Sequence, residues 1–288
     1  MYKPVATQPQ KQLIAHRGAS GSAPEHTIAA YRLALEQRAD FVEPDLAVTK
    51  DGVLVCLHDD TLERTSNVAK VFADRPSANV PSRGSEKRWL ANDFTVEEIR
   101  RLDAGSWFDP KFAGLRVPTF QEMIDLVRGK AGLYPELKSP PLYTARGVDM
   151  EQIFVRVIKQ NGLDAPDSLK TTPVIIQSFD ENTIRRVSRD LPTIPRVFLT
   201  SRDEDVTEAR IKELAKFATG IAPEKVVIAR HPEMVKRAHD VGLTVTSWTF
   251  RADQKTEFAS VREEMAHFLY TLGIDALFTN NPDQFPRR

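Results

Sequence analysis

The chain has 288 residues, of which 41% are hydrophobic, so it can bury a large core and is not expected to be disordered. Its 40 basic and 40 acidic residues cancel, which disfavours a general attraction to nucleic acid or to an anionic membrane. No apolar run approaches the roughly 18 residues needed to cross a bilayer, and we expect a soluble protein without a transmembrane segment.

The start of the chain and its cysteine content bear on compartment and redox chemistry. Residues 1–12 contain no hydrophobic signal-peptide segment, and the compartment stays open. Cys56 is the only cysteine, which rules out an intrachain disulfide and a thiolate metal cluster. It lies in the apolar run VLVCLH (53–58), and we expect a buried structural thiol.

Apolar runs rich in β-branched residues alternate with amphipathic stretches along the chain. The expected strands are 12–16, 41–46, 131–137, 172–179, 195–199, 218–223, 243–248 and 276–280. The expected helices include 27–37, 120–127, 181–191, 208–217 and 233–242. This alternation indicates right-handed crossovers and a parallel sheet, and eight repeats favour a closed (β/α)8 TIM barrel over a doubly wound open sheet. We expect one α/β domain over residues 1–288.

Two helix starts carry a capping signal. Thr119 with Glu122, and Thr95 with Glu98, have the spacing of a capping box. In that motif the two side chains bond to free backbone N–H groups of the first helical turn. We therefore expect helices to begin after both threonines.

Residues 62–117 break the alternation of strands and helices. They contain a stretch rich in Pro, Gly, Ser and charge (74–89) and one short helical pattern (95–102). We expect an insertion on the barrel rim, after the hairpin of the second strand, that covers a site or binds a ligand; a disordered spacer is the alternative. Trp89 and Trp107 belong either to a small core of this insertion or to a surface that faces substrate.

The segment 41–60 predicts a hairpin. Two extended runs flank Asp51-Gly52, which is the strongest short-range signal for a two-residue turn. With this turn, Val48 faces Val55 across an antiparallel pair.

The same register places charged residues together. Asp45 faces His58, and Glu43 shares the face of Asp45 because the two are separated by one residue. That residue, Pro44, cannot donate a ladder hydrogen bond and predicts a strand end or a bulge. A solvated hairpin face is the alternative, but apolar neighbours that resemble barrel wall weaken it.

Further charged residues lie where other strands end. His16 and Arg17 follow the first strand, and Glu136 and Lys138 end the third. Strand C-termini of a (β/α)8 barrel open on one face, so we expect these residues to meet there. The full set expected at this face is His16, Arg17, Glu43, Asp45, His58, Glu136 and Lys138.

Three carboxylates held close together would repel unless protons or a cation intervened. All-oxygen ligands suit a hard cation, Ca²⁺ or Mg²⁺, better than zinc. A cation beside two histidines and an arginine is suited to cleavage of a phosphoester. Arg17 would bind the phosphate, while one imidazole removes a proton from the nucleophile and the other protonates the leaving group. The sequence leaves open which histidine is the acid.

Seven motifs follow one another along the chain. They are HRGASGSAPEHT (16–27), EPD (43–45), TKDGVLVCLHD (49–59), ELK (136–138), QSF (177–179), SWT (247–249) and DALFTNNPD (275–283). In this order they resemble the motifs of the glycerophosphodiester phosphodiesterases. The chain is similar to the branch with an inserted segment after the HD motif. This branch favours a periplasmic or secreted location, with the cytoplasm as the alternative.

The resemblance implies a (β/α)8 barrel that hydrolyses glycerophosphodiesters, such as glycerophosphocholine, to glycerol 3-phosphate and an alcohol. It implies a small-molecule substrate and one divalent cation, Ca²⁺ or Mg²⁺. Carried over by motif, the catalytic histidines are His16 and His58, the metal carboxylates are Glu43, Asp45 and Glu136, the phosphate contact is Arg17, and Phe179 and Trp248 line the substrate pocket. From the residues alone we expect Lys138 to help neutralise the phosphodiester.

Two positions depart from the family pattern. His26 stands where the usual PENT motif has asparagine, and Asn280 stands where an acid is usual. Neither change removes a metal carboxylate or a catalytic histidine, so we expect effects on hydrogen bonding near the site and on substrate preference. The histidines at 231, 239 and 267 lie in helical patterns and are expected to have surface or capping roles.

Two other functions compete with this interpretation. A sphingomyelinase or phospholipase D-like enzyme uses a related arrangement, but it would need a lipid-binding surface, and no amphipathic or aromatic-rich membrane stretch is evident. A non-catalytic phosphodiester-binding barrel would need positive charge but no matched acid and base, so the presence of both His16 and His58 argues against it. The sequence leaves open the headgroup, the native metal, the route through a cyclic phosphate or direct attack by water, and the oligomeric state.

Overall fold

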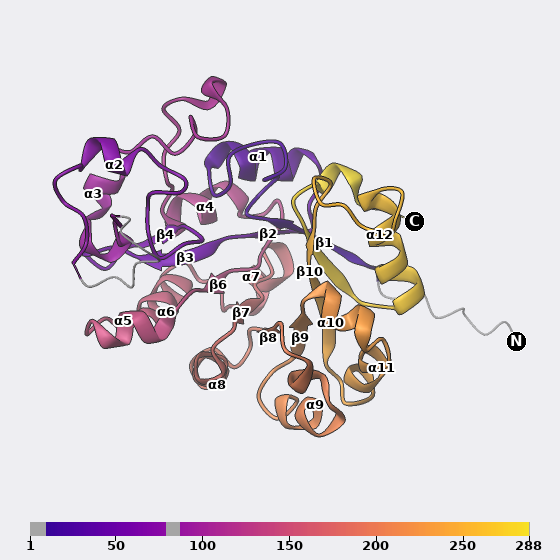
Figure 1. The fold of residues 1–288 in the computed structure, drawn as a ribbon. Coiled ribbons are helices and arrows are strands. Elements are labelled where there is room, and N and C mark those ends of the chain that lie inside the picture. Colours follow the sequence, from indigo (N-terminus) through magenta and orange to yellow (C-terminus); the bar gives the residue numbers. More distant parts are fainter. Residues whose placement is uncertain (1–9, 79–86, 288) are drawn as a thin grey trace, which may run out of the picture.

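A computed structural model describes residues 10–78 and 87–287, with strands and helices alternating along most of the chain (Figure 1). Two of the predicted strands are each broken in two. The second strand is divided at Pro44 into β2 (Phe41–Glu43) and β3 (Asp45–Val48). The third is divided into β5 (Gly132–Leu133) and β6 (Glu136–Leu137).

The strands close into a barrel. β1 (Gln12–His16) pairs in parallel with β2 on one side and with β11 (Ala276–Thr279) on the other. β2 pairs with β5, and its continuation β3 pairs with β6. Parallel pairs then run through β7 (Ile176–Ser178), β8 (Arg196–Thr200), β9 (Gly220–Pro223) and β10 (Thr244–Phe250) to β11. Counting each broken strand once, the described residues form a ring of eight parallel strands, and the predicted TIM-barrel fold is confirmed.

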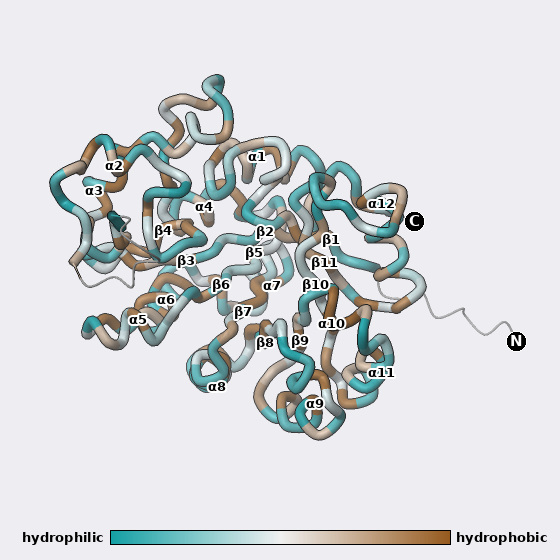
Figure 2. The backbone as a smooth tube through the Cα atoms, in the orientation of Figure 1, coloured by the Kyte–Doolittle hydropathy of each residue, from teal (hydrophilic) through white to brown (hydrophobic). Residues whose placement is uncertain are grey.

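Helices surround the strands (Figure 2), and apolar residues of both kinds of element form a buried cluster. Thr27 begins α1, since its side chain accepts a hydrogen bond from the backbone N–H of Ala30, and the capping box of Thr119 and Glu122 is confirmed at the start of α4. The helices are α1 (Ile28–Glu36), α4 (Phe120–Val127), α5 (Pro140–Ala145), α6 (Met150–Gln160), α7 (Pro166–Thr171), α8 (Glu181–Asp190), α9 (Glu208–Leu214), α10 (Lys225–Arg230), α11 (Glu233–Asp240) and α12 (Val261–Ala266).

The interior of the barrel is filled by side chains. Phe41, Tyr134 and Phe278 pack edge to face there, with ring centroids 5.8 and 5.1 Å apart, together with smaller apolar residues. A separate and larger cluster lies between the strands and the helices. The barrel is therefore a packed core and not a pore, which leaves its rim as the place for a site.

The predicted hairpin exists, but its register was wrong by one residue. β3 pairs antiparallel with β4 (Leu54–Cys56), and Val48 faces Leu54 instead of Val55. The reason is a wider turn, because the Thr49 hydroxyl donates to Asp51 at 2.6 Å and accepts from the Val53 N–H at 3.0 Å. These local bonds enlarge the loop beyond two residues.

The corrected register changes the partner of Asp45. Its backbone carbonyl accepts from the N–H of Leu57 at 2.9 Å, so His58 is not its cross-strand partner. His58 lies beyond the end of β4 and still reaches the same cavity as Glu43. The prediction that the hairpin gathers these side chains holds, although the pairing behind it does not.

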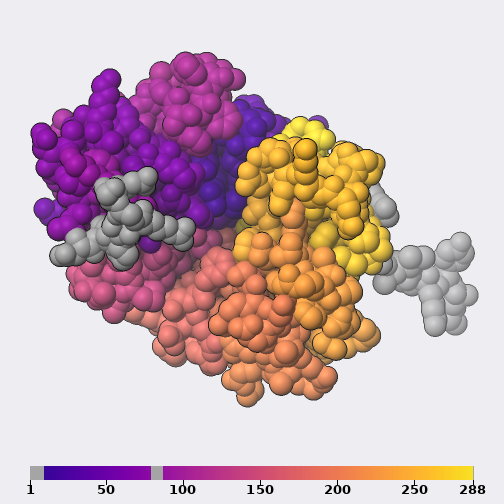
Figure 3. Space-filling model, in the orientation of Figure 1, coloured from indigo at the N-terminus to yellow at the C-terminus, as the bar shows by residue number. Residues whose placement is uncertain are grey.

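The insertion packs against the barrel and flanks one side of the face seen in Figure 3. It contains α2 (Val68–Val71), α3 (Val96–Ile99) and two short 3₁₀ turns, Ala91–Asp93 and Pro110–Phe112. The capping box that begins α3 at Thr95 is confirmed. Residues 79–86 of the predicted Pro/Ser-rich stretch lie outside the described residues.

Buried side chains of the insertion resolve one open alternative. Trp89 is buried and donates its indole N–H to the carbonyl of Phe72 at 2.8 Å, so it belongs to a small core. Trp107 is 41% exposed.

Cys56 is fully buried, as predicted for a structural thiol. Among the helices of the described residues, none has the length and hydrophobicity to span a membrane.

Candidate active site

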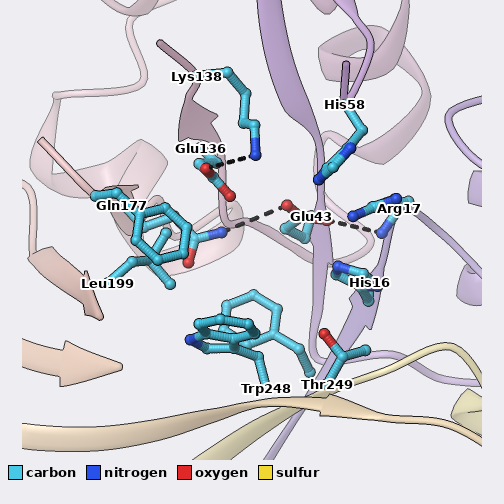
Figure 4. Close-up of a pocket in the computed structure, with 12 residues that line it drawn as sticks. His16, Arg17, Glu43, His58, Glu136, Lys138, Gln177, Leu199, Trp248 and Thr249 are labelled. Atoms are coloured by element: carbon cyan, nitrogen blue, oxygen red, sulfur yellow. Dashed lines mark hydrogen bonds and ion pairs between the residues drawn. The ribbon is translucent and has the colours of Figure 1, made fainter. Parts of the chain in front are cut away.

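A cavity of about 140 Å³ opens at the rim of the barrel, where the parallel strands end (Figure 4). Its lining side chains come from seven of the eight barrel strands, counting each broken strand once, and from residues that follow strands or the hairpin. Eight of the nine predicted site residues line it, and Asp45 lies buried behind them. The lining residues are His16, Arg17, Glu43, His58, Glu136, Lys138, Gln177, Phe179, Leu199, Trp248, Thr249 and Phe278.

The three predicted metal carboxylates lie together at this cavity: Glu43 and Glu136 line it, and Asp45 lies directly behind them. Glu43 ends β2, Asp45 begins β3, and Glu136 begins β6 directly opposite Asp45 in the parallel register. One oxygen of each carboxylate lies within 4.8 Å of the others, and all three residues are buried. The break at Pro44 allows Glu43, just before it, and Asp45, just after it, to point to one centre.

Two basic side chains partly balance this charge. Lys138 Nζ lies 3.1 Å from Glu136 and 3.9 Å from Asp45. Arg17 Nε lies 3.2 Å from Asp45, and the backbone N–H of Arg17 donates to Glu43 at 2.8 Å. Two cations beside three carboxylates leave an excess of one negative charge if all ionise.

The carboxyl pKa values reflect this imbalance. Burial and the charges of Asp45 and Glu136 raise the pKa of Glu43 well above its usual value. Burial, opposed by Lys138, raises the pKa of Glu136 to about 8. Burial would also raise the pKa of Asp45, but Lys138, His26 and Arg17 together hold it well below its usual value. Without a cation, protons would therefore relieve the repulsion between these groups.

The donor set fits a hard divalent cation. It consists of carboxylate oxygens, which Mg²⁺ and Ca²⁺ prefer, and contains no sulfur. In addition, the buried side-chain oxygen of Gln177 has no hydrogen-bond partner among the described residues. The amide nitrogen of Gln177 lies 3.5 Å from Glu43, so this orphaned oxygen lies beside the cluster.

His16 is held by a neutral partner. It ends β1, and its Nδ1 donates to the side-chain oxygen of Asn280 at 2.7 Å. Burial and the charge of Arg17 lower the pKa of His16 to about 3. The ring is therefore neutral at pH 7, and Nε2 keeps its lone pair.

His58 is held by a charged partner. Its Nδ1 donates to Asp59 at 2.6 Å. Asp59 is half-buried, which would raise its pKa, but hydrogen bonds from His58 and Arg64 hold that pKa well below its usual value. The carboxylate therefore fixes the orientation of the His58 ring through its Nδ1–H.

Arg17 has an unusual backbone conformation. Its φ of 58° lies in the left-handed region, and Gly18 follows with φ 83°. A Cβ at Gly18 would lie 2.6 Å from the carbonyl carbon of Ala30, so no larger residue fits. This turn directs the N–H of Arg17 to Glu43, while the guanidinium lies 3.0 Å from Glu25.

His26, which departs from the family pattern, contacts one of the clustered carboxylates. His26 Nε2 donates to Asp45 at 2.9 Å, and its Nδ1 accepts from the Tyr31 hydroxyl at 2.8 Å. His26 is 4% exposed, and burial lowers its pKa. The expected effect of this departure on hydrogen bonding near the site is therefore visible in the contact with Asp45.

Aromatic side chains form the remaining wall. Phe179 and Trp248 pack edge to face with ring centroids 5.6 Å apart. The Trp248 indole N–H donates to the carbonyl of Ala222 at 2.8 Å, which fixes the ring. Phe179 is 45% exposed and lies at the mouth. Both residues are where the motifs predicted.

Sequence reasoning missed several charged and polar contacts. Gln177 lies in the QSF motif near the end of β7 and lines the cavity. Its position near a strand end, the same signal that was applied to Glu43 and Glu136, could have identified it. Glu25, in the PEHT motif, holds Arg17, and Asp59, next to His58 in the HD motif, holds that ring. Arg64, in the insertion, contacts both acids.

A second cavity adjoins the first and shares His16, Arg17 and Thr249 with it. Trp107 lines this second cavity, so it faces the site region while Trp89 does not. The remaining histidines lie away from both cavities. His239 bonds to Asp275 at 2.8 Å, His231 lies 3.4 Å from Asp203, and His267 packs on Phe258.

Comparisons with known proteins agree with this geometry. The model of the glycerophosphoryl diester phosphodiesterase family matches residues 16–284. A glycerophosphodiester phosphodiesterase of Bacillus subtilis is 33% identical over 282 residues, covering 94% of this chain and 84% of that protein. One from Caldanaerobacter subterraneus is 33% identical over 273 residues and covers 94% of each chain.

A solved structure extends the comparison. It is a phosphodiesterase of Oleispira antarctica in complex with the product sn-glycerol-3-phosphate, with a TM-score of 0.75 and 27% identity over 96% of this chain and 95% of that one. The barrel and these relatives define a phosphoric diester hydrolase. The chain belongs to the glycerophosphoryl diester phosphodiesterase family, and the predicted enzyme class is confirmed.

Proposed function

We propose that this enzyme hydrolyses deacylated glycerophosphodiesters to glycerol 3-phosphate and an alcohol, using a divalent cation and a histidine acid–base pair. The observation that carries the proposal is a cluster of three buried carboxylates within 4.8 Å of one another, two of which line the same cavity as His16 and His58. The product bound by the Oleispira relative supports the same substrate class.

Glu43, Asp45 and Glu136 would hold the cation, either Ca²⁺ or Mg²⁺. When bound, such a cation polarises phosphoryl oxygens and offsets their developing charge. It would also keep Glu43 and Glu136 ionised, because its positive charge would offset the burial and the repulsion that raise their pKa values.

Arg17 and Lys138 supply the remaining positive charge for the phosphate. Both side chains line the cavity, and each is ion-paired to the carboxylate cluster. Arg17 can present planar N–H donors to two oxygens, whereas Lys138 acts as a point charge. We assign both to phosphate binding.

The hydrogen-bond partners of the histidines support different proton-transfer roles. Neutral His16 has Nε2 free to take a proton from the attacking hydroxyl, so we assign it as the general base. His58, with its Nδ1–H held by ionised Asp59, is suited to donate from Nε2 to the leaving ester oxygen. The attacking hydroxyl is either water or the glycerol 2-hydroxyl.

Phe179 and Trp248 are assigned to the glycerol backbone. Their rings form a short apolar wall at one side of the charged groups, as Figure 4 shows for Trp248. We also propose that the chain is a single domain whose rim insertion, about residues 62–117, borders the alcohol side through Trp107. Its packing into the main core supports this.

Metal removal tests the proposal. Dialysis against EDTA is expected to abolish release of choline from glycerophosphocholine, and added Ca²⁺ or Mg²⁺ is expected to restore it. A matched control measures EDTA-treated protein by circular dichroism to show that the fold persists. Full turnover by metal-free protein would contradict the cation assignment.

Substrate comparison separates the alternatives. Glycerophosphocholine is expected to be cleaved much faster than its diacyl parent, because the cavity of about 140 Å³ that holds the charged side chains is too small to bury two acyl chains. Faster cleavage of the acylated lipid would favour a sphingomyelinase or phospholipase D-like enzyme. Binding without release of alcohol would favour a non-catalytic barrel.

A further inference from the structure

Arg64 connects two parts of the site from outside the barrel strands. It lies in the insertion, six residues after His58 in the sequence. Its guanidinium donates to Asp59 at 2.6 and 3.1 Å and to Glu25 at 3.0 and 2.7 Å. One side chain therefore holds two carboxylates, each with two hydrogen bonds.

Each of these carboxylates holds a functional side chain. Asp59 accepts from His58 Nδ1 at 2.6 Å, and Glu25 accepts from Arg17 at 3.0 Å. A continuous chain of contacts thus runs from His58 through Asp59, Arg64 and Glu25 to Arg17. No other described residue bonds to both Asp59 and Glu25.

We infer that Arg64 is a positioning residue that sets His58 and Arg17 relative to each other. This inference rests on the proposed function, in which His58 donates a proton and Arg17 binds phosphate. The planar guanidinium fixes the angle between the two carboxylates, because its donors form a rigid fork. A flexible ammonium could neutralise the same charge without fixing that angle.

Burial separates this network from an ordinary surface ion pair. The Glu25 and Asp59 side chains are 12% and 27% exposed, while Arg64 is 42% exposed. Exposed single pairs contribute little, but a network with four short bonds and partly buried acids holds its geometry better. Without Arg64, the two carboxylates would lose a shared cation, and Asp59 would be free to rotate away from His58.

The insertion offers a matched control. Arg75 lies in the same segment, is 46% exposed, and bonds to Glu98 at 2.5 Å. Neither Arg75 nor Glu98 lines either cavity of the site. Arg75→Gln therefore removes a charge and an ion pair of similar exposure, together with contacts to the rings of Phe72 and Phe94, without touching the network.

The test compares the kinetics of Arg64→Gln, Arg64→Lys and Arg75→Gln on glycerophosphocholine with saturating cation. A misplacement of the acid and the phosphate contact by about 1 Å is expected to lower kcat up to about 100-fold. We therefore expect Arg64→Gln to lower kcat by about 10- to 100-fold. Arg64→Lys should recover only part of this loss, and Arg75→Gln should match the wild type.

A double-mutant cycle provides the readout that a merely structural role would not move. Because Arg64 acts on His58 through Asp59 and on Arg17 through Glu25, Arg64→Gln should add little to the loss already caused by the combined variant Asp59→Asn/Glu25→Gln. Wild-type kcat in Arg64→Gln, full recovery by Arg64→Lys, or additive losses in the cycle would each overturn the inference. Activity retained by His58→Ala would instead overturn the proposed function.

Discussion

The two histidines of the cavity are held by chemically different partners. His16 donates Nδ1–H to the neutral amide of Asn280, whereas His58 donates to the carboxylate of Asp59. His16 is also buried beside Arg17, which lowers its pKa to about 3, while Asp59 and Arg64 surround His58 with a charged network. Two identical side chains in one cavity thus have chemically different partners, which is the arrangement that the proposed base and acid roles would require.

The difference shows how the partners of a histidine, more than its own position, determine its function. An amide orients the ring without adding charge, so a buried ring stays neutral and can accept a proton. A carboxylate orients the ring and stabilises its charged form, so the ring can donate. The departure at Asn280 from the usual acid therefore bears on the chemistry of His16 directly.

Removal of either ring is expected to have the largest effect. His16→Ala and His58→Ala should each lower kcat by about 10² to 10⁴, the usual contribution of a positioned acid or base. KM should change little, since phosphate binding is assigned to other side chains. Steady-state kinetics on glycerophosphocholine measure this, with His239→Ala as the control because His239 lies on the surface against Asp275. A near-wild-type kcat in either variant would remove that histidine from the mechanism.

Replacement of the neutral partner of His16 by a carboxylate should give both histidines the same kind of partner. Asn280→Asp places a carboxylate 2.7 Å from His16 Nδ1, so the pKa of His16 should rise from about 3 by about 1 to 3 units. A base must be neutral to act, and the acid side of the kcat/KM profile should therefore move to higher pH. Asn281→Asp is a neighbouring control. An unchanged acid side in Asn280→Asp would show that His16 is not the base.

The carboxylate cluster predicts that the stability of the metal-free protein depends on pH, and this effect is expected to be smaller than the losses of kcat described above. In metal-free protein the pKa of Glu136 is raised to about 8 from 4.5, so the native state holds a proton that the unfolded state releases in this interval. The free energy of unfolding should then fall as pH rises from 4.5 to 8, by at most about 1.4 kcal/mol per unit for one group. Glu136→Gln cannot ionise and should flatten the slope.

Urea unfolding in EDTA across this pH range measures the slope. Saturating cation is the control, because a bound cation keeps Glu136 ionised in the native state as well and should remove its contribution to the slope in this interval. Identical slopes for wild type and Glu136→Gln without metal would contradict the assigned repulsion.

The sequence predicted the barrel and most of the site because both depend on short-range patterns. Eight apolar runs that alternate with helices define the strands, and parallel strands place their ends on one face. His16, Glu43 and Glu136 could therefore be brought together without knowing any contact between them. These three positions followed from strand ends, whereas His58 required the hairpin, and Phe179 and Trp248 required the family motifs.

Contacts made by loops could not be predicted in the same way. The hairpin register was wrong because the Thr49 side chain bonds within the turn and widens it, which the Asp51-Gly52 signal does not reveal. Asn280 is 264 residues from His16, and Arg64 reaches Glu25 across 39 residues. Such pairings depend on how loops fold over the rim.

The most direct test of the account is the response of the two histidine variants to a better leaving group. A glycerophosphodiester of 4-nitrophenol needs little protonation as it leaves, so it should restore most of the kcat lost by His58→Ala. The same substrate should not restore His16→Ala, because the attacking hydroxyl still needs a base. Selective rescue of His58→Ala is the predicted result. Selective rescue of His16→Ala, or equal rescue of both, would contradict the assignment of His16 as base and His58 as acid.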